Sequence, residues 1–246
     1  MIAIILSRRD SKEDDQIVSI YTKKYGKQEL IARGVKKIIS KNSTHLEPCT
    51  LVDIEIASGK EWQVLITSNT KHYFRAIRED LKKSIIAEQI VTLTNHILKQ
   101  DDKDEGIFSL LSHALYRLEQ TSQPSLLLID TYIIRLLECL GFSPQIDTCA
   151  ITGDNSHLTH FLPAAGGFIS HQAFLERTDR SSTAILVSKE ALLYVPFLFQ
   201  KGWEDIAYIP TEHHVVLHRI VYEFLIYHQE KHIPDWFRYT KIVQSL

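Results

Sequence analysis

The chain has 246 residues, 44% of them hydrophobic and 24% charged, and a formal net charge of −2, which is ordinary for a globular protein. It holds no apolar run of about 18 residues, which excludes a membrane-spanning helix. Its three cysteines, Cys49, Cys139 and Cys149, are too few and too widely spaced for a disulfide framework. Because the N-terminal apolar run precedes the charges, the wrong order for a secretion signal, we expect a cytoplasmic protein.

Residues 2–74 have the pattern of a small all-β unit. Val52, Ile54 and Ile56 alternate with polar residues, and Trp62, Val64 and Ile66 alternate in the same way. Five or six short strands in one compact stretch predict a small barrel, of which the OB type is one form. The candidate strands are Ile2–Leu6, Gln16–Thr22, Gln28–Gly34, Thr50–Ala57, Glu61–Thr67 and Thr70–Phe74.

Helical spacing replaces the strand pattern near residue 76. Apolar residues recur every three or four positions in two amphipathic segments, residues 81–100 and Asp104–Glu119. Residues 124–142 are apolar nearly all round, which predicts a central buried helix ending before Gly141. The repeating positions of the first two segments are Ile86, Ile90, Leu93, Ile97, Ile107, Leu110, Leu111, Ala114 and Leu118.

The remainder of the chain is less regular. Residues 142–187 carry prolines, a Gly-Gly pair and no sustained period, which predicts an irregular segment. Ser188–Phe199 and Glu212–His228 have helical spacing, and a short helix is expected near the C-terminus. The sequence therefore predicts an α+β chain with a domain of residues 1–78 and a helical domain of residues 79–246, which carries an inserted loop region of residues 143–187.

Positive charge gathers in the segment of residues 21–41, which holds seven Lys or Arg and a single acid, Glu29. In "KQELIARG", Leu30 and Ala32 are predicted to face the barrel core, and Arg33 faces outward. Lysines on a turn and a loop beside one strand predict a continuous positive strip that can track a phosphate backbone. The alternative is a solvated face that keeps an edge strand soluble. Tyr21, Tyr25, Trp62 and Tyr73 are candidate surfaces for base stacking.

Histidine pairs four residues apart, His214 with His218 and His228 with His232, can present two metal ligands on one helix face. The segment "HHVVLH" lacks the internal glutamate of a metalloprotease helix, so no catalytic metal is predicted there. The sequence also shows no nucleophile elbow and no phosphate-binding glycine loop, and we expect no enzymatic activity.

The segment "CAITGDNSHLTHFLPAAGGFISHQAF" has the outline of a zinc ribbon in which only Cys149 is retained. Thr152, Ser170 and Ala173 stand where three further cysteines would complete a structural zinc site. His157, His160 and His171 are alternative ligands, but their spacing does not match a ribbon. We therefore expect a metal-free loop held by packing, with no cofactor.

Several segments, taken in order, resemble the bacterial RecO family of recombination mediators. They are "ILSRRDSKEDDQIVSIYTKKYGKQELIARGVKK", "HLEPCTLVDIEI", "YIIRLLECLGFSPQIDTCAITG" and "FLPAAGGFIS". The resemblance implies an N-terminal OB-type barrel, then a helical domain with a degenerate zinc-ribbon-like insertion. It implies a nucleoid-associated DNA repair and recombination protein that binds single- and double-stranded DNA, anneals complementary strands and helps to load recombinase, without catalytic turnover.

The resemblance also implies partners and site residues. The partners are RecR and the C-terminal tail of the single-stranded DNA-binding protein, and Arg135 on the central helix is carried over as the residue near the site for that tail. Ile133 stands where the family has an acidic residue. The residues expected to bind DNA are Lys23, Lys24, Lys27, Arg33, Lys36 and Lys37. Arg8 and Arg9 are weaker candidates because acids surround them in the sequence. The alternative function is an OB-fold and helical scaffold for protein interactions, without a direct role on DNA.

Overall fold

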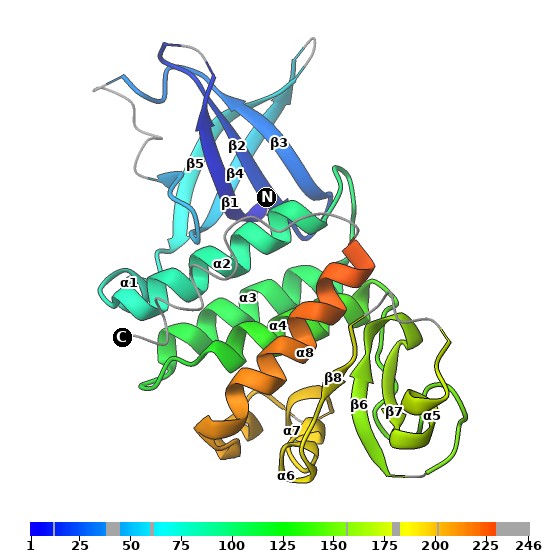
Figure 1. Ribbon diagram of the computed structural model, residues 1–246. Coiled ribbons are helices and arrows are strands. Elements are labelled where there is room, and N and C mark those ends of the chain that lie inside the picture. The colour runs from blue at the N-terminus through cyan, green and yellow to red at the C-terminus, as the bar shows by residue number, and fades with distance from the viewer. Residues whose placement is uncertain are drawn as a thin grey trace. The chain divides into compact units, whose positions relative to one another are not determined.

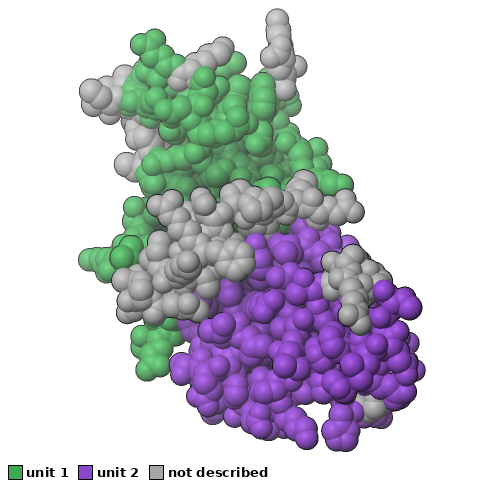
Figure 2. All heavy atoms as spheres, in the orientation of Figure 1, with its two compact units in different colours: residues 1–124, 235–246 green, residues 125–234 purple. Residues whose placement is uncertain are grey.

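Five strands at the start of the chain close into a barrel, and helices make up much of the rest (Figure 1). The structure is a computed structural model that describes residues 1–11, 13–37, 45–59, 62–155, 157–178, 183–200 and 202–229. Lys41, His232 and the helix expected near the C-terminus lie outside these ranges. Packing divides the described chain into two units, coloured separately in Figure 2: unit 1 ends at Pro124 and unit 2 begins at Ser125.

The barrel of unit 1 has the strand order β1-β2-β3-β5-β4, which is the OB-type arrangement that the sequence predicts. Neighbouring strands pair antiparallel except β3 and β5, which run parallel and, among the described residues, pair at Leu30 with Gln63 and at Ile31 with Val64. The candidate strand Thr70–Phe74 is the end of β5 up to His72 rather than a sixth strand. The strands are β1 (Ile2–Asp10), β2 (Gln16–Thr22), β3 (Gly26–Ala32), β4 (Leu51–Ser58) and β5 (Gln63–His72).

Alternating apolar side chains fill the barrel, since successive residues of a strand point to opposite faces. Leu30 and Ala32 of β3 are 1% and 2% exposed, which confirms that they face the core. Val52 and Ile54 of β4 are also buried, as their alternation predicts.

The alternation of Trp62, Val64 and Ile66 predicts that these residues share the core face of β5, and this prediction is wrong. Leu65 is buried in the barrel core, whereas Ile66 is 51% exposed. The pairing of β4 with β5 shifts between Glu55, which lies opposite Thr67, and Ile56, which lies opposite Leu65, so that β5 carries one additional residue at Ile66. A bulge of this kind inserts one residue into the strand and exchanges the two faces beyond it, which the alternation of the sequence does not reveal.

Three helices complete the described part of unit 1. They are α1 (Arg75–Arg78), α2 (Leu81–Ile97) and α3 (Glu105–Gln120). The side chain of Asp80 accepts a hydrogen bond from the Lys83 amide at the start of α2, and Asp104 does the same for α3. The helical spacing is confirmed, because all of its predicted apolar positions are buried except Leu110, which is half-buried.

Unit 2 is built around α4 (Leu126–Cys139), which packs against the long C-terminal helix α8 (Thr211–Gln229). Ser125 caps the start of α4, and Gly141 follows its end with a φ of 88°, a value suited to glycine. Most side chains of α4 are buried, as the sequence predicts for the central helix.

The segment of residues 142–187 is more regular than predicted. It contains a three-stranded sheet in the order β7-β6-β8, formed by residues that are too few per strand to show a period. The expected helix Ser188–Phe199 is interrupted at Leu193 and Tyr194, and Pro196 lies in the first turn of the second half. The elements are β6 (Leu158–Leu162), η2 (Pro163–Ala165), β7 (Gly167–Ser170), α5 (His171–Leu175), β8 (Ile185–Leu186), α6 (Lys189–Leu192), α7 (Val195–Phe199) and η3 (Asp205–Tyr208).

Candidate nucleic-acid interface

The basic side chains of residues 21–37 lie at the two ends of β3, and we call this set with its strand the basic edge. Lys23 and Lys24 are in the turn between β2 and β3, which lies at the end of the barrel next to α2 (Figure 1). Arg33, Lys36 and Lys37 follow the other end of the strand. A strand of this length separates its ends by roughly 20 Å. The structure therefore gives two positive groups instead of one continuous strip.

The first group is held in place by a tight turn. Gly26 has a φ of 67°, and a Cβ at this position would lie 2.1 Å from the Asp102 carbonyl oxygen. Only glycine allows the turn to approach the α2–α3 connection so closely. Lys23 lies 3.9 Å from the Glu105 carboxylate, and Lys24 lies over the Tyr25 ring at 5.0 Å from its centre. A hydrogen bond with Tyr25 raises the pKa of Lys24, which keeps its positive charge.

The second group is bound to the hairpin between β1 and β2. The Lys36 ammonium lies 2.8 Å from a carboxylate oxygen of Asp10, and the Lys37 ammonium lies 3.7 Å from Asp14. Arg33 is exposed and, within the described part of the chain, has no carboxylate within 4 Å. The weaker candidates are also paired, Arg8 with Glu47 at 2.6 Å and Arg9 with Glu29 at 3.5 Å.

Lys27, unlike the neighbouring lysines, bonds to backbone oxygens at the end of α2. Its ammonium donates hydrogen bonds to the carbonyl oxygens of Asn95 and Leu98, the latter at 3.0 Å. These carbonyls close the last turn of α2, where positive charge is favoured by unpaired backbone oxygens. Asn95 is in turn bonded to Ser7 and Ser19, so this contact joins the barrel to α2. We therefore remove Lys27 from the set proposed to bind DNA.

The aromatic residues proposed for base stacking include exposed rings and one buried ring. Tyr25, Trp62 and Tyr73 are 45%, 37% and 44% exposed. Tyr21 is fully buried, and its hydroxyl lies 3.1 Å from the Asp104 carbonyl oxygen. The prediction that Tyr21 offers a stacking surface is wrong, because the α2–α3 connection covers its ring. Of the exposed rings, Tyr25 lies beside the basic group of the β2–β3 turn.

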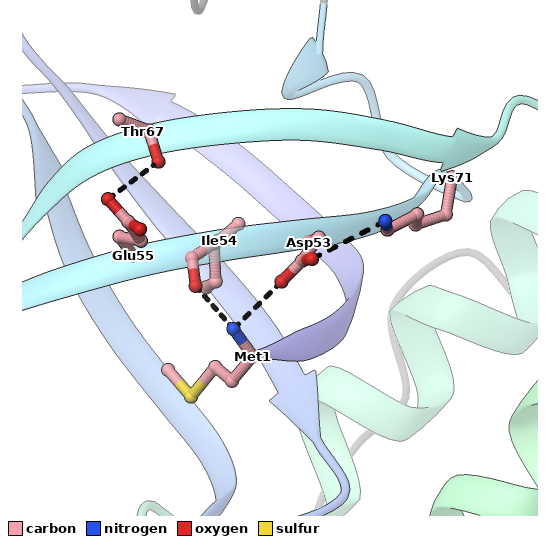
Figure 3. Close-up of polar contacts among 6 residues, drawn as sticks. All are labelled: Met1, Asp53, Ile54, Glu55, Thr67 and Lys71. Carbon is pink, nitrogen blue, oxygen red and sulfur yellow. Dashed lines mark hydrogen bonds and ion pairs between the residues drawn. The ribbon is translucent and has the colours of Figure 1, made fainter.

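The β4 side of the barrel carries polar contacts of its own (Figure 3). The Met1 amine donates to Asp53 at 2.9 Å, and the Lys71 ammonium lies 3.5 Å from the same carboxylate. The hydrogen bond from the amine lowers the pKa of Asp53. Thr67 donates to Glu55 across the β4–β5 pair at 3.3 Å. With Asp53 and Glu55 among these residues, this side offers less net positive charge than the basic edge.

Arg135 lies on α4 in unit 2 and is 24% exposed. Its guanidinium donates to both carboxylate oxygens of Glu138, each at 2.8 Å, and to the Phe199 carbonyl oxygen at 2.8 Å. Ile133 is buried and contributes no charge. An acidic peptide that binds at Arg135 must therefore compete with Glu138.

Cys149 is buried among apolar side chains that include Ala173. Burial raises the pKa of its thiol, but hydrogen bonds from Thr152 and from backbone amides, including that of Ser170 at 3.4 Å, bring the pKa down to about 7. The loop thus still directs donors at this sulfur. Within the described ranges, no three His, Cys, Asp or Glu side chains are grouped to hold a metal ion. The absence of a cofactor stays a prediction.

The histidines proposed as alternative ligands have other contacts. His160 stacks on Phe174 with ring centres 3.9 Å apart, and burial lowers its pKa. The ring of His171 is 6.1 Å from that of His160, and His157 is exposed in the loop before β6. His214 and His218 of α8 have different hydrogen-bond partners: His214 bonds to the Ile209 carbonyl oxygen at 2.9 Å and His218 to Asp130 at 2.7 Å.

Comparison with known proteins decides the family. A model described as "Recombination protein O N terminal" matches residues 1–74, and one described as "Recombination protein O C terminal" matches residues 78–236. The chain belongs to the RecO family. The resemblance read from the sequence is thereby confirmed. The two models meet between residues 74 and 78, whereas packing groups α2 and α3 with the barrel. The boundary after residue 78 stays a prediction.

Relatives named "DNA repair protein RecO" agree with this assignment. The one from Dehalococcoides mccartyi is 32% identical over 169 residues, which cover 68% of this chain and 66% of that protein. The one from a Thermoanaerobacter species is 28% identical over 167 residues, covering 68% and 67%. The one from Alkaliphilus metalliredigens is 22% identical over 230 residues and covers 92% of each. In the part of this RecO-family chain that the structure describes, no helix is long and apolar enough to cross a membrane.

Proposed function

We propose that this RecO-family chain binds single- and double-stranded DNA through the basic edge of its barrel. The observation that carries the proposal is the placing of exposed cations at both ends of β3 on an OB-type barrel, in a family of DNA repair proteins. Lys24 and Arg33 are the first residues expected to meet phosphate, because neither has a carboxylate within 4 Å in the described structure. Lys23, Lys36 and Lys37 follow once their carboxylate partners are displaced.

Binding of this kind reads charge rather than sequence. Each cation that neutralises a phosphate releases a bound counterion, so affinity falls as salt rises. The exposed Tyr25 ring beside Lys24 can stack on an unpaired base, which adds affinity for single strands without preference for one base. An OB barrel commonly covers roughly 4–16 nucleotides, a length that can reach both ends of β3.

Membership of the RecO family supports a proposed biological role. The chain anneals complementary strands and helps to load recombinase, together with RecR, on strands coated by the single-stranded DNA-binding protein. Neutralising phosphates brings two strands together without a catalytic residue, so the proposal requires no turnover. Arg135 is proposed to receive the acidic tail of the single-stranded DNA-binding protein in exchange for Glu138.

A second candidate is a scaffold that binds proteins and not DNA. The observation in its favour is that five cations near the basic edge already have a carboxylate within 4 Å. On this alternative, the lysines keep the barrel surface solvated. The two candidates differ in how binding to DNA responds to salt.

The test is fluorescence anisotropy of a labelled oligo-dT strand over a series of salt concentrations. Two variants undergo the same change of charge: Lys24→Glu with Arg33→Glu on the basic edge, and Lys189→Glu with Arg219→Glu on exposed positions of unit 2. The proposal expects salt-sensitive binding that the first variant loses and the second retains. Absent binding, or equal loss in both variants, would leave the scaffold as the better account.

A further inference from the structure

The basic group after β3 is accompanied by a matching set of carboxylates on the β1–β2 hairpin. Asp10 lies 2.8 Å from Lys36 and Asp14 lies 3.7 Å from Lys37. All four side chains are exposed, Asp10 by 64% and Lys36 by 38% in the closer pair. Any phosphate that reaches these lysines therefore meets a carboxylate that already occupies the ammonium.

The carboxylates are held where they are by the surrounding loops. Gln16 donates to the second oxygen of Asp10 at 3.0 Å. The Lys36 amide donates to the Asp14 carbonyl oxygen at 3.1 Å, and the Gly34 amide donates to the Asp15 carboxylate at 2.8 Å. The hairpin and the loop after β3 thus form one bonded assembly. Hydrogen bonds from Lys36 and Gln16 lower the pKa of Asp10, so it remains charged near neutral pH.

We infer that Asp10 and Asp14 are built-in competitors for phosphate, and that they set the strength and the salt dependence of DNA binding at Lys36 and Lys37. This inference rests on the proposed function of the basic edge. It assigns the two aspartates a role in the DNA site although their own charge opposes DNA. They limit binding to ligands with many phosphates, because a single phosphate gains too little to displace a fixed carboxylate.

The exchange has a measurable signature. Exposed ion pairs contribute little to stability, so a polyanion can open them at low cost. A displaced carboxylate then recovers a counterion, which cancels part of the counterion release that drives DNA binding. Removing the carboxylates should therefore strengthen binding and also steepen its dependence on salt.

The experiment compares the wild-type chain with Asp10→Asn and Asp14→Asn, singly and together, using oligo-dT anisotropy over a salt series. Asparagine keeps the size of the side chain and its capacity to accept from Gln16. We expect Kd to fall about three-fold for each change and about ten-fold for both at low salt, from the Coulomb energy of a unit charge some 7 Å from a phosphate in water. The log–log salt slope should steepen by at most roughly 0.7 for each lysine released on single strands, because the carboxylate cancels only part of the counterion release at that lysine.

Glu13→Gln is the matched control. Glu13 lies in the same hairpin, is exposed, and has no cation within 4 Å of its carboxylate in the described structure. The Glu13→Gln substitution removes the same charge without releasing a lysine, so the salt slope of this variant should stay at the wild-type value. Circular dichroism melts of each variant establish that the barrel remains folded.

The outcomes separate this inference from the proposed function. If the wild type binds DNA and the double variant matches it in Kd and slope, the inference fails and the proposed function stands. If Glu13→Gln steepens the slope as much as Asp10→Asn does, the effect is one of overall charge and the inference also fails. If neither the wild type nor any variant binds DNA, both fail.

Discussion

The ion pairs of the basic edge and the Asp130–His218 pair of unit 2 use similar groups in opposite surroundings. In the Asp10–Lys36 pair the side chains are 64% and 38% exposed, whereas Asp130 and His218 are 0% and 9% exposed. Water competes for the first pair, so an external polyanion can replace one partner at little cost. In the second pair no solvent is available to replace a lost partner. Exposure therefore separates charges that can be exchanged for a ligand from charges that only maintain the fold.

The largest expected effect is on the buried pair. His218→Ala leaves the Asp130 carboxylate buried without its partner, and its second oxygen already has no hydrogen bond within the described structure. We expect the free energy of unfolding to fall by about 3–5 kcal/mol, measured by urea denaturation followed by circular dichroism. Asp130→Leu combined with His218→Leu removes both charges and should recover most of that loss. A double variant as unstable as His218→Ala would contradict this account.

Lys27 gives the next largest effect, since it is a lysine of the basic segment with a structural contact. Lys27→Met keeps the aliphatic stem but leaves the Asn95 and Leu98 carbonyls at the end of α2 without their donor. We expect a loss of about 2 kcal/mol in urea unfolding, typical of a hydrogen bond to a charged group. Lys24→Met, a matched change in the neighbouring turn, should leave stability unchanged and weaken DNA binding more. The reverse order would place Lys27 in the DNA site.

A smaller effect is expected when pH changes the charge on His218. Burial lowers the pKa of His218, but the Asp130 carboxylate outweighs burial and raises it above its ordinary value. The stabilisation is thus fully present below about pH 6.5, the ordinary histidine pKa, and is lost as pH rises through the raised pKa. A neutral imidazole still bonds to Asp130, so the loss is smaller than for His218→Ala.

The pH measurement needs a reference, because burial lowers the pKa of His160 and of His228. Their contribution to the free energy of unfolding therefore rises with pH, opposite to that of His218. The reference is the Asp130→Leu, His218→Leu variant, whose unfolding free energy is subtracted from that of the wild type at each pH. A difference that does not decline above neutral pH would refute the role given to this pair.

The smallest effect on stability is expected at the exposed pair. Lys36→Ala breaks the contact with Asp10 yet should leave the midpoint of thermal unfolding within error of the wild type. The same change should weaken binding to oligo-dT several-fold and make the log–log salt slope shallower by less than roughly 0.7, because Asp10 already cancels part of the counterion release at Lys36. A clear loss of stability would mean that the pair holds the hairpin together and is not exchangeable.

Much of the fold could be predicted because its signals are local. The alternation in β3 and β4 and the helical spacing of α2 to α4 each report burial along one element. The face of β5 could not be predicted, since a bulge at Ile66 depends on pairing with β4. The short strands β6 to β8 were missed because they are stabilised by one another rather than by a period in the sequence.

The contacts of the candidate DNA-binding residues could not be predicted either, because they depend on packing between distant segments. Basic composition located the segment, but Lys24 and Lys27 are alike in sequence and only the approach of α2 distinguishes them. The acids that pair with Lys36 and Lys37 come from a hairpin 26 and 23 residues earlier, so the sequence shows their charge but not their pairing. Tyr21 was misplaced for the same reason, as residues 101–104 cover it.

The pairing of β3 with β5 has a consequence for motion. Within the described residues this seam pairs Leu30 with Gln63 and Ile31 with Val64, while the other junctions of the barrel pair over longer stretches. Amide hydrogens bonded across the seam should exchange with solvent sooner than those bonded between β1 and β2, because short junctions open locally at lower free energy. Arg33 lies two residues beyond Ile31, between Ala32, which pairs with Gln16 of β2, and Gly34, whose amide donates to Asp15, so an opening of the seam leaves this cation anchored to the β1–β2 hairpin.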